Sequence, residues 1–116
     1  MIRIKLLHLH CMLNEESDKD EVFLKFNGHR VWPEHGRYHA MNSNERIALN
    51  VVIEHDPAKD LTVELWDWDL LSSNDKIGTF QTSVRGNDYG KFTSSLRVAN
   101  AGSTASYLLE WEIMEH

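Results

Sequence analysis

An Asn-Gly pair, Asn27–Gly28, constrains the folding of this chain more than any other feature. It stands between two short strand-like runs, residues 22–26 and 29–32. A two-residue type I′ turn needs positive φ at both central residues, and Asn-Gly is a pair that readily adopts it. The sequence therefore predicts an antiparallel β-hairpin at this point.

Similar runs recur along the whole chain of 116 residues. Alternating and β-branched segments of strand length are separated by turn residues at short intervals, a pattern typical of an all-β sandwich or barrel. We expect eight strands, at residues 2–13, 22–26, 29–32, 46–54, 61–67, 77–84, 91–98 and 107–113, and a loop over residues 33–44. The prediction is a single domain over residues 1–116, an all-β, eight-stranded antiparallel Greek-key β-sandwich.

The first expected strand changes its apolar face partway along. Ile2, Ile4 and Leu6 share one parity. The apolar residues after them take the other parity: Leu7, Leu9, Cys11 and Leu13. Because successive side chains of a strand point to opposite faces, this switch predicts a β-bulge or a strong twist near Leu6 and Leu7.

Charge and missing motifs narrow the class of function. Twelve Lys and Arg against eighteen Asp and Glu leave a net charge of −6. Nucleic-acid binding usually leaves a basic stripe, and this sequence has none, so no nucleic-acid partner is expected. The sequence has no Gly-x-Ser-x-Gly, no phosphate-binding glycine loop and no His-Glu-x-x-His. We therefore expect a protein that is not an enzyme.

Cys11 is the single cysteine of the sequence, so no intrachain disulfide can form. The first residues carry charges inside their apolar stretch and lack a small-residue cleavage site, which favours a first strand over a signal peptide. These two features predict a reducing, cytoplasmic setting.

The most specific motif is a strand that ends in Asp-x-Asp. Asp67 closes the run 61–67 and Asp69 follows two positions later. Asp75 comes after five more residues, directly before Lys76-Ile77-Gly78. Two residues apart at a strand end, Asp67 and Asp69 point the same way, and a short turn can bring Asp75 back toward them. Calcium takes about six to eight oxygen ligands and tolerates irregular geometry, so such a cluster suits it.

This segment resembles the second calcium-binding loop of the C2 domain family, the calcium-dependent phospholipid-binding β-sandwiches. In that family a strand ends in Asp-aromatic-Asp, and a third Asp precedes Ile/Leu-Gly. Residues 20–28 look like the family's Ser-Asp-Pro-Tyr-Val-Lys strand, without its proline, and residues 107–113 look like its last strand. Asn14 stands where the family often has another Asp. The resemblance implies calcium as the bound ion, with these ligands: Asn14, Asp20, Asp67, Asp69 and Asp75.

The aspartates allow two interpretations, and each implies a different function. The first is a non-enzymatic C2-like module that coordinates calcium through loops at one end of the sandwich and docks to a protein or a membrane. In the second, the aspartates only cap turns, because Asp and Asn side chains hydrogen-bond to their own backbone in turns. Lys76 is then one candidate to offset the negative charge of the clustered carboxylates. The chain is then a calcium-independent protein-interaction or structural subunit, which uses a sheet face or edge.

Leu70 and Leu71 stand at the expected tip of the Asp69–Asp75 loop, where they are candidates for membrane or partner contact. Two buried leucines contribute at most about 3–6 kcal/mol. The neighbouring expected loop opposes an anionic membrane, because it carries Glu15, Glu16, Asp18 and Asp20. We expect no phospholipid binding without calcium and weak binding with it, and packing against a partner protein is the alternative.

Two interpretations of the histidines, and two of the tryptophans, stay open. Among the seven histidines, His8 and His10 alternate on one face, where they either chelate a metal with a third ligand or form a polar, solvent-facing side of the first strand. The tryptophans form either a ligand-stacking surface or ordinary packing in the core and on sheet faces. They are Trp32, Trp66, Trp68 and Trp111.

Overall fold

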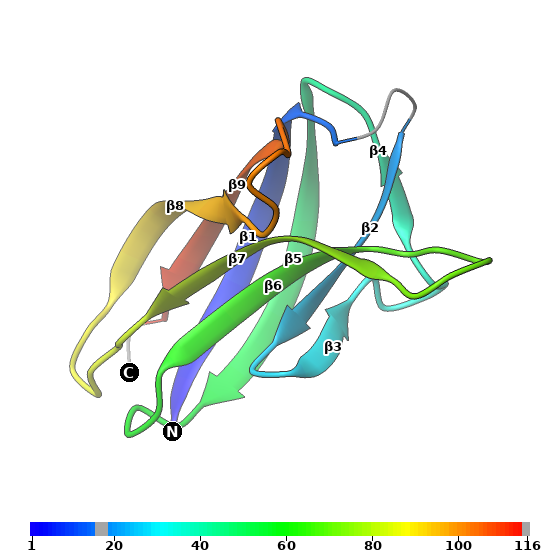
Figure 1. Ribbon diagram of the computed structural model, residues 1–116. Coiled ribbons are helices and arrows are strands. Elements are labelled where there is room, and N and C mark those ends of the chain that lie inside the picture. The colour runs from blue at the N-terminus through cyan, green and yellow to red at the C-terminus, as the bar shows by residue number, and fades with distance from the viewer. Residues whose placement is uncertain (16–18, 115–116) are drawn as a thin grey trace.

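The computed structural model describes residues 1–15 and 19–114, and all regular elements in these ranges are β-strands. The strands are β1 (Ile2–Leu13), β2 (Asp20–Phe26), β3 (His29–Trp32), β4 (His39–Met41), β5 (Glu45–His55), β6 (Leu61–Asp67), β7 (Asp75–Thr82), β8 (Gly90–Val98) and β9 (Ser106–Ile113) (Figure 1). The described residues contain no helix that could cross a membrane.

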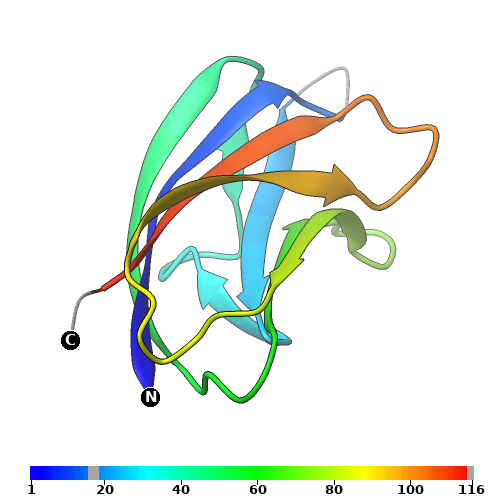
Figure 2. The ribbon, with the colours of Figure 1, turned by 90° about the vertical axis from the view of Figure 1, so that its left-hand side faces the viewer.

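The strands form two layers that face each other (Figures 1 and 2). One layer has the order β5-β1-β9-β8, and the other has the order β3-β2-β6-β7, with β4 also paired to β2. Every pairing is antiparallel. The layers join where β7 meets β8, through the pairs Gly78↔Val98 and Thr79↔Arg97. The predicted all-β antiparallel sandwich is confirmed.

A ninth short strand, β4, lies inside the segment that the sequence predicts as a loop. It pairs with the start of β2 through Asp20↔Met41 and Val22↔His39, and Met41 is fully buried. Three residues are too few to show an alternating pattern, so the sequence carries no strand signal here.

The core lies between the layers and follows the predicted alternation. In β6 the inward residues Leu61, Val63 and Leu65 are buried, and Thr62 and Glu64 between them are half-exposed. The last strand repeats the pattern with Tyr107, Leu109, Trp111 and Ile113 inside. Because both layers turn one apolar face inward, a single continuous core forms.

The predicted change of face in β1 is confirmed as a β-bulge. Against β9, Leu6 pairs with Trp111 and His8 with the next residue, Glu110, so Leu7 is the extra residue of β1. Against β5, Leu6 pairs with Val51 and His8 with Ala48, and Asn50 in this irregular stretch has φ +54°. The bulge keeps Leu6 and then Leu9 on the core side. Leu13, expected in the same apolar series, is 44% exposed because β1 ends there.

The predicted hairpin is also confirmed, with φ values of +49° at Asn27 and +86° at Gly28. Asn27 is tied to β6 as well. Its N–H donates to the Thr62 carbonyl at 2.8 Å, and its Oδ1 accepts from the Thr62 N–H at 2.8 Å. The turn therefore fixes the β2–β3 hairpin and its position beside the start of β6.

Candidate functional site

The residues proposed from the sequence gather at one end of the sandwich. This end carries the connection after β1, the β3–β4 connection and the β6–β7 loop, and the β6–β7 loop projects far beyond the strands (Figure 1). Of the acidic residues expected in the β1–β2 connection, Glu16 and Asp18 lie outside the described residues.

Asp20 is fully buried at the start of β2. Its Oδ2 accepts a hydrogen bond from the Tyr107 hydroxyl at 2.5 Å and another from the Glu15 N–H at 2.8 Å. Burial first, and then the bond to the Asp20 carboxylate, raises the pKa of Tyr107 well above its usual range. Asp20 therefore serves as an internal hydrogen-bond acceptor between β2, β9 and the connection after β1.

Asp67 closes β6 and is 8% exposed. Its Oδ1 accepts from the Glu21 N–H at 2.9 Å, and the next residue, Trp68, donates its N–H to the Glu21 carbonyl at 2.7 Å. The ladder places Asp67 directly opposite Asp75, which is exposed. The structure thus brings these two carboxylates to facing positions and uses Asp67 to hold the end of β6 against β2.

Asp69 is exposed and organises the β6–β7 loop. Its Oδ1 accepts from the Leu71 N–H at 2.9 Å, and its Oδ2 accepts from the Ser72 hydroxyl at 2.7 Å. These bonds lower the pKa of Asp69, the Leu71 amide most of all. The Asp69 N–H in turn donates to Asn74 Oδ1 at 2.8 Å. This is the turn-capping role that the sequence left as an alternative.

Asn14 bonds to Ser43 in the turn before β5. Asn14 Oδ1 accepts from the Ser43 hydroxyl at 2.7 Å, and the Asn14 N–H donates to the same hydroxyl oxygen at 3.1 Å. Lys76, expected as a partner of the aspartates, instead bonds Glu64 at 3.1 Å, because both side chains lie on the outer face of the β6–β7 pair.

Asn14, Asp20, Asp67 and Asp69 thus make hydrogen bonds to groups of the protein itself, and Asp75 is exposed. Over residues 1–15 and 19–114, no three His, Cys, Asp or Glu side chains are grouped so as to hold a metal ion. The carboxylate oxygens described for Asp20, Asp67 and Asp69 accept hydrogen bonds from N–H and O–H donors of the protein itself. Calcium coordination stays a prediction.

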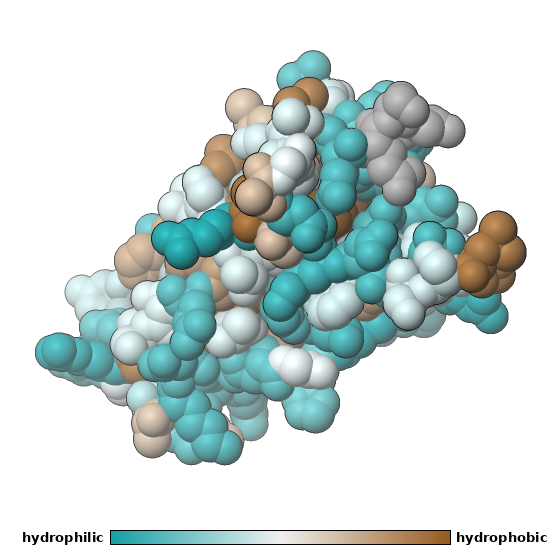
Figure 3. Space-filling view, in the orientation of Figure 1, coloured by the Kyte–Doolittle hydropathy of each residue, from teal (hydrophilic) through white to brown (hydrophobic). Residues whose placement is uncertain are grey.

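Beyond the aspartates, the same end carries an apolar surface, which we call the apolar tip: Tyr38, Trp68, Leu70 and Leu71. Leu70 is 72% exposed and Leu71 is 92% exposed. Figure 3 shows hydrophobic atoms at the far end of the projecting loop. A groove of about 450 Å³ runs between this loop and Tyr38, with Glu21, Asp67 and Asp69 along it.

Aromatic stacking fixes the base of the apolar tip. The rings of Tyr38 and Trp68 stack with their centroids 5.2 Å apart, and the Arg37 guanidinium lies 5.5 Å from the Trp68 ring centroid. Sequence reasoning missed Tyr38 and Arg37. They lie about thirty positions before Trp68 in a segment without an alternating pattern, so no local signal links them to the loop.

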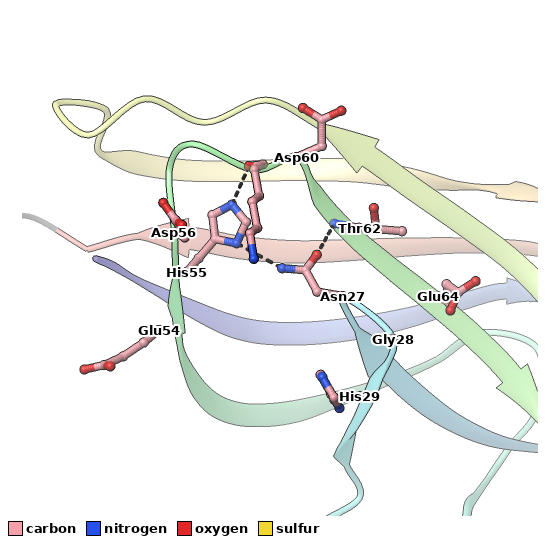
Figure 4. Close-up of a pocket in the computed structure, with 10 residues that line it drawn as sticks. Asn27, Gly28, His29, Glu54, His55, Asp56, Asp60, Thr62 and Glu64 are labelled. Carbon is pink, nitrogen blue, oxygen red and sulfur yellow. Dashed lines mark hydrogen bonds between the residues drawn. The ribbon is translucent and has the colours of Figure 1, made fainter.

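A second pocket lies at the other end of the sandwich, around the β2–β3 turn and the β5–β6 connection (Figure 4). The His55 side chain is 2% exposed and makes hydrogen bonds to groups on two sides of this pocket. Because Asn27 Oδ1 accepts from Thr62, its amide NH₂ donates to His55 Nδ1 at 3.0 Å, and His55 Nε2–H donates to the Lys59 carbonyl at 3.0 Å. These bonds give His55 a structural role.

His8 and the tryptophans other than Trp68 take ordinary positions. His8 is half-buried on the outer face of its layer, with Nδ1 3.4 Å from Glu110 Oε2, and Glu110 is held by both Nε and Nη2 of Arg46. Trp32 and Trp111 are buried, whereas Trp66 is half-buried under Lys25, whose Nζ lies 4.5 Å from the ring centroid. Packing, one of the two expected roles of the tryptophans, accounts for these three rings.

Comparison with known proteins shows the fold. No protein-family model and no curated protein matches the sequence. A solved structure described as a C2 domain superposes with a TM-score of 0.62 at 12% identity, covering 100% of both chains. A C2 domain of a plant extended synaptotagmin 1 superposes with a TM-score of 0.52 at 16% identity, covering 95% of this chain and 90% of that one.

Proposed function

We propose that this chain, whose fold is that of a C2 domain, is a non-enzymatic binding module that docks a protein partner through the apolar tip without needing calcium. One observation carries the proposal: the β6–β7 loop holds Leu70 and Leu71 72% and 92% exposed at its end. Full burial of a leucine contributes about 1.5–3 kcal/mol, so a partner that covers both gains a substantial driving force.

The loop is ordered before any partner arrives. Asp69 bonds the Leu71 amide and the Ser72 hydroxyl, and Asn74 bonds the Asp69 amide. Binding to a loop that is already ordered loses less conformational entropy, which favours affinity. The stacked Tyr38 and Trp68 support the same surface, since aromatic side chains dominate the energetics of many protein interfaces.

Charge favours a protein partner over an anionic membrane. Glu21, Asp67 and Asp69 line the groove beside the leucines, and the chain carries a net charge of −6. Anionic headgroups repel such a surface unless basic residues or bound cations offset it. Arg37, held over Trp68, offers a carboxylate on the partner a single cationic contact at the edge of the apolar tip.

The internal donors support the calcium-independent form of the proposal. Tyr107 and Glu15 satisfy Asp20, Glu21 satisfies Asp67, and the loop's own groups satisfy Asp69. In the alternative, calcium displaces these donors and is bound by Asn14, Asp20, Asp67, Asp69 and Asp75, with weak calcium-dependent phospholipid binding. A cytoplasmic setting stays a prediction from the single cysteine and from the strand-like first residues.

Cosedimentation with phosphatidylserine vesicles separates the two forms. We expect no vesicle binding in EDTA or in millimolar calcium. Calcium-dependent binding that Leu70→Ala/Leu71→Ala abolishes would favour the alternative.

Affinity capture from a cell extract in EDTA is the second experiment. A protein held by the wild-type chain should be lost with Leu70→Ala/Leu71→Ala. Tyr89→Ala, which removes a similarly exposed side chain in the β7–β8 connection, serves as the matched control and should retain it.

A further inference from the structure

The β5 strand presents a long open edge. It stands last in the hydrogen-bonded order of strands, so β1 pairs with one of its sides and no described strand pairs with the other (Figure 2). It has eleven residues, from Glu45 to His55, whereas β3 at the opposite end of the order has four. An unpaired edge of this length is a template for pairing with another strand.

The side chains of β5 are arranged symmetrically about Asn50, the residue with φ +54°. Arg46 and Glu54, of opposite charge, stand four positions to either side, and both are exposed. Ala48 and Val52 stand two positions to either side, and Val52 is 50% exposed. The inward-facing positions mirror each other as apolar pairs: Ile47 with Ile53, and Leu49 with Val51.

We propose that two copies of this chain associate through their β5 edges, antiparallel, with a twofold axis at Asn50. In this register Arg46 of each copy lies opposite Glu54 of the other, and Ala48 lies opposite Val52. Opposite charges on directly facing residues stabilise an antiparallel pair, and a twofold interface repeats each contact. The inference does not depend on the apolar tip, which uses another part of the molecule.

Side-chain parity is compatible with this register. Odd-numbered residues 47–53 face inward and even-numbered residues 46–54 face outward in β5, and the pairing joins odd to odd and even to even. The inner faces of the two copies therefore stay on one side of a continuous sheet. Ile47, Val51 and Ile53, which are half-buried at the open edge, lose further exposure in the pair.

The Arg46 guanidinium can serve two carboxylates. Within the chain it bonds Glu110 through Nε and Nη2, which leaves Nη1 for Glu54 of the second copy. The charges near both ends hinder unspecific edge pairing, as charged side chains do on other edge strands. Because these charges have opposite signs at mirrored positions, they favour one register and disfavour a shift.

Charge reversal with complementation tests the register. Sedimentation equilibrium over a concentration series is measured for the wild-type chain, Arg46→Glu, Glu54→Arg and an equimolar mixture of the two variants. Each variant alone places like charges opposite each other at both sites, so its dissociation constant should rise about tenfold. In the heterodimer, Glu54 of the Arg46→Glu copy faces the native Arg46 of the other copy. At the second site the two substituted positions face each other, again with opposite charges. The mixture should therefore regain wild-type affinity.

Lys91→Glu is the matched control, because it makes the same kind of charge change at an exposed residue of β8. Strand β8 lies at the opposite edge of the layer from β5. The Lys91→Glu variant should dimerise like the wild type. Since a restored heterodimer requires both variants to be folded, loss of folding cannot imitate the expected result. The proposal is overturned if the wild-type chain stays monomeric at the highest concentration, if the single variants dimerise as well as the wild type, or if the mixture is no tighter than its components.

Discussion

The Tyr107 hydroxyl donates a hydrogen bond to Asp20 Oδ2 at 2.5 Å, joining residues 87 positions apart in the sequence. It links β9 in one layer to the first residue of β2 in the other. Asp20 is a residue that the C2 resemblance assigns to calcium, and here a buried phenol of the protein itself contacts its carboxylate. The loop end is therefore held by internal donors, which is the basis of the calcium-independent account.

Tyr107→Phe should destabilise the fold by about 1–3 kcal/mol, because the buried Asp20 carboxylate loses one of its donors. Denaturant unfolding of the variant and the wild type measures this difference in unfolding free energy. Tyr89→Phe is the control, since Tyr89 is 65% exposed and its change should stay within about 0.5 kcal/mol. Equal unfolding free energies of the two variants would show that the Tyr107–Asp20 hydrogen bond does not stabilise the fold.

Stability should decline at alkaline pH, because folding raises the pKa of Tyr107, mainly through burial and then through its bond to Asp20. A tyrosine in the unfolded chain releases its proton near pH 10, whereas Tyr107 keeps its proton in the folded state. Its contribution is therefore complete below about pH 10 and is lost progressively as the pH rises above that value. Unfolding free energies measured across this range should fall less steeply for Tyr107→Phe, and an equally steep fall would contradict the assignment.

The Cys11 thiol should be inert in the folded protein. Cys11 is fully buried in β1, and burial raises its pKa above the usual thiol range. Because the thiolate is the reactive form, a thiol reagent such as dithionitrobenzoate should label Cys11 only after unfolding. The rate of labelling in buffer and in denaturant gives the comparison, and rapid labelling of the native chain would contradict this packing.

Gly78→Ala should weaken the junction between the two layers. A Cβ at Gly78 would lie 3.0 Å from the Arg97 carbonyl oxygen and 3.1 Å from that of Leu96, and both are backbone atoms of β8. Relieving such contacts costs about 1–3 kcal/mol. Gly102→Ala, where a Cβ meets nothing within 4 Å, is the matched control and should unfold like the wild type. Similar unfolding midpoints for both variants would show that the β7–β8 junction tolerates the added methyl group.

The predicted parts of the fold are those with short-range causes. The Asn27–Gly28 turn follows from backbone conformations that these two residues adopt readily, and the bulge at Leu7 follows from a parity switch within one strand. The β4 strand escaped prediction because its pairing with β2 depends on the completed sheet.

The place of the aspartates in the fold was predicted, but their hydrogen bonds were not. Asp67, Asp69 and Asp75 do lie at one end of the sandwich, since their strand and loop were identified correctly. Asp67 accepts from Glu21, Asp69 accepts from groups of its own loop, and Asp20 accepts from Tyr107 on the last strand. Such long-range bonds leave no spacing pattern in the sequence, and the same is true of the Tyr38–Trp68 stack.

Melting temperature in EDTA and in millimolar calcium tests the central claim most directly, with the wild-type chain beside Asp67→Asn/Asp69→Asn. A ligand at about 100 times its dissociation constant adds roughly 2.7 kcal/mol of stability, or about 10 °C for a domain of this size. Because internal donors hold these carboxylates, the account predicts the same melting temperature in both buffers for the wild type, and likewise for the variant. A calcium-induced rise of several degrees in the wild type that the double substitution abolishes would contradict it.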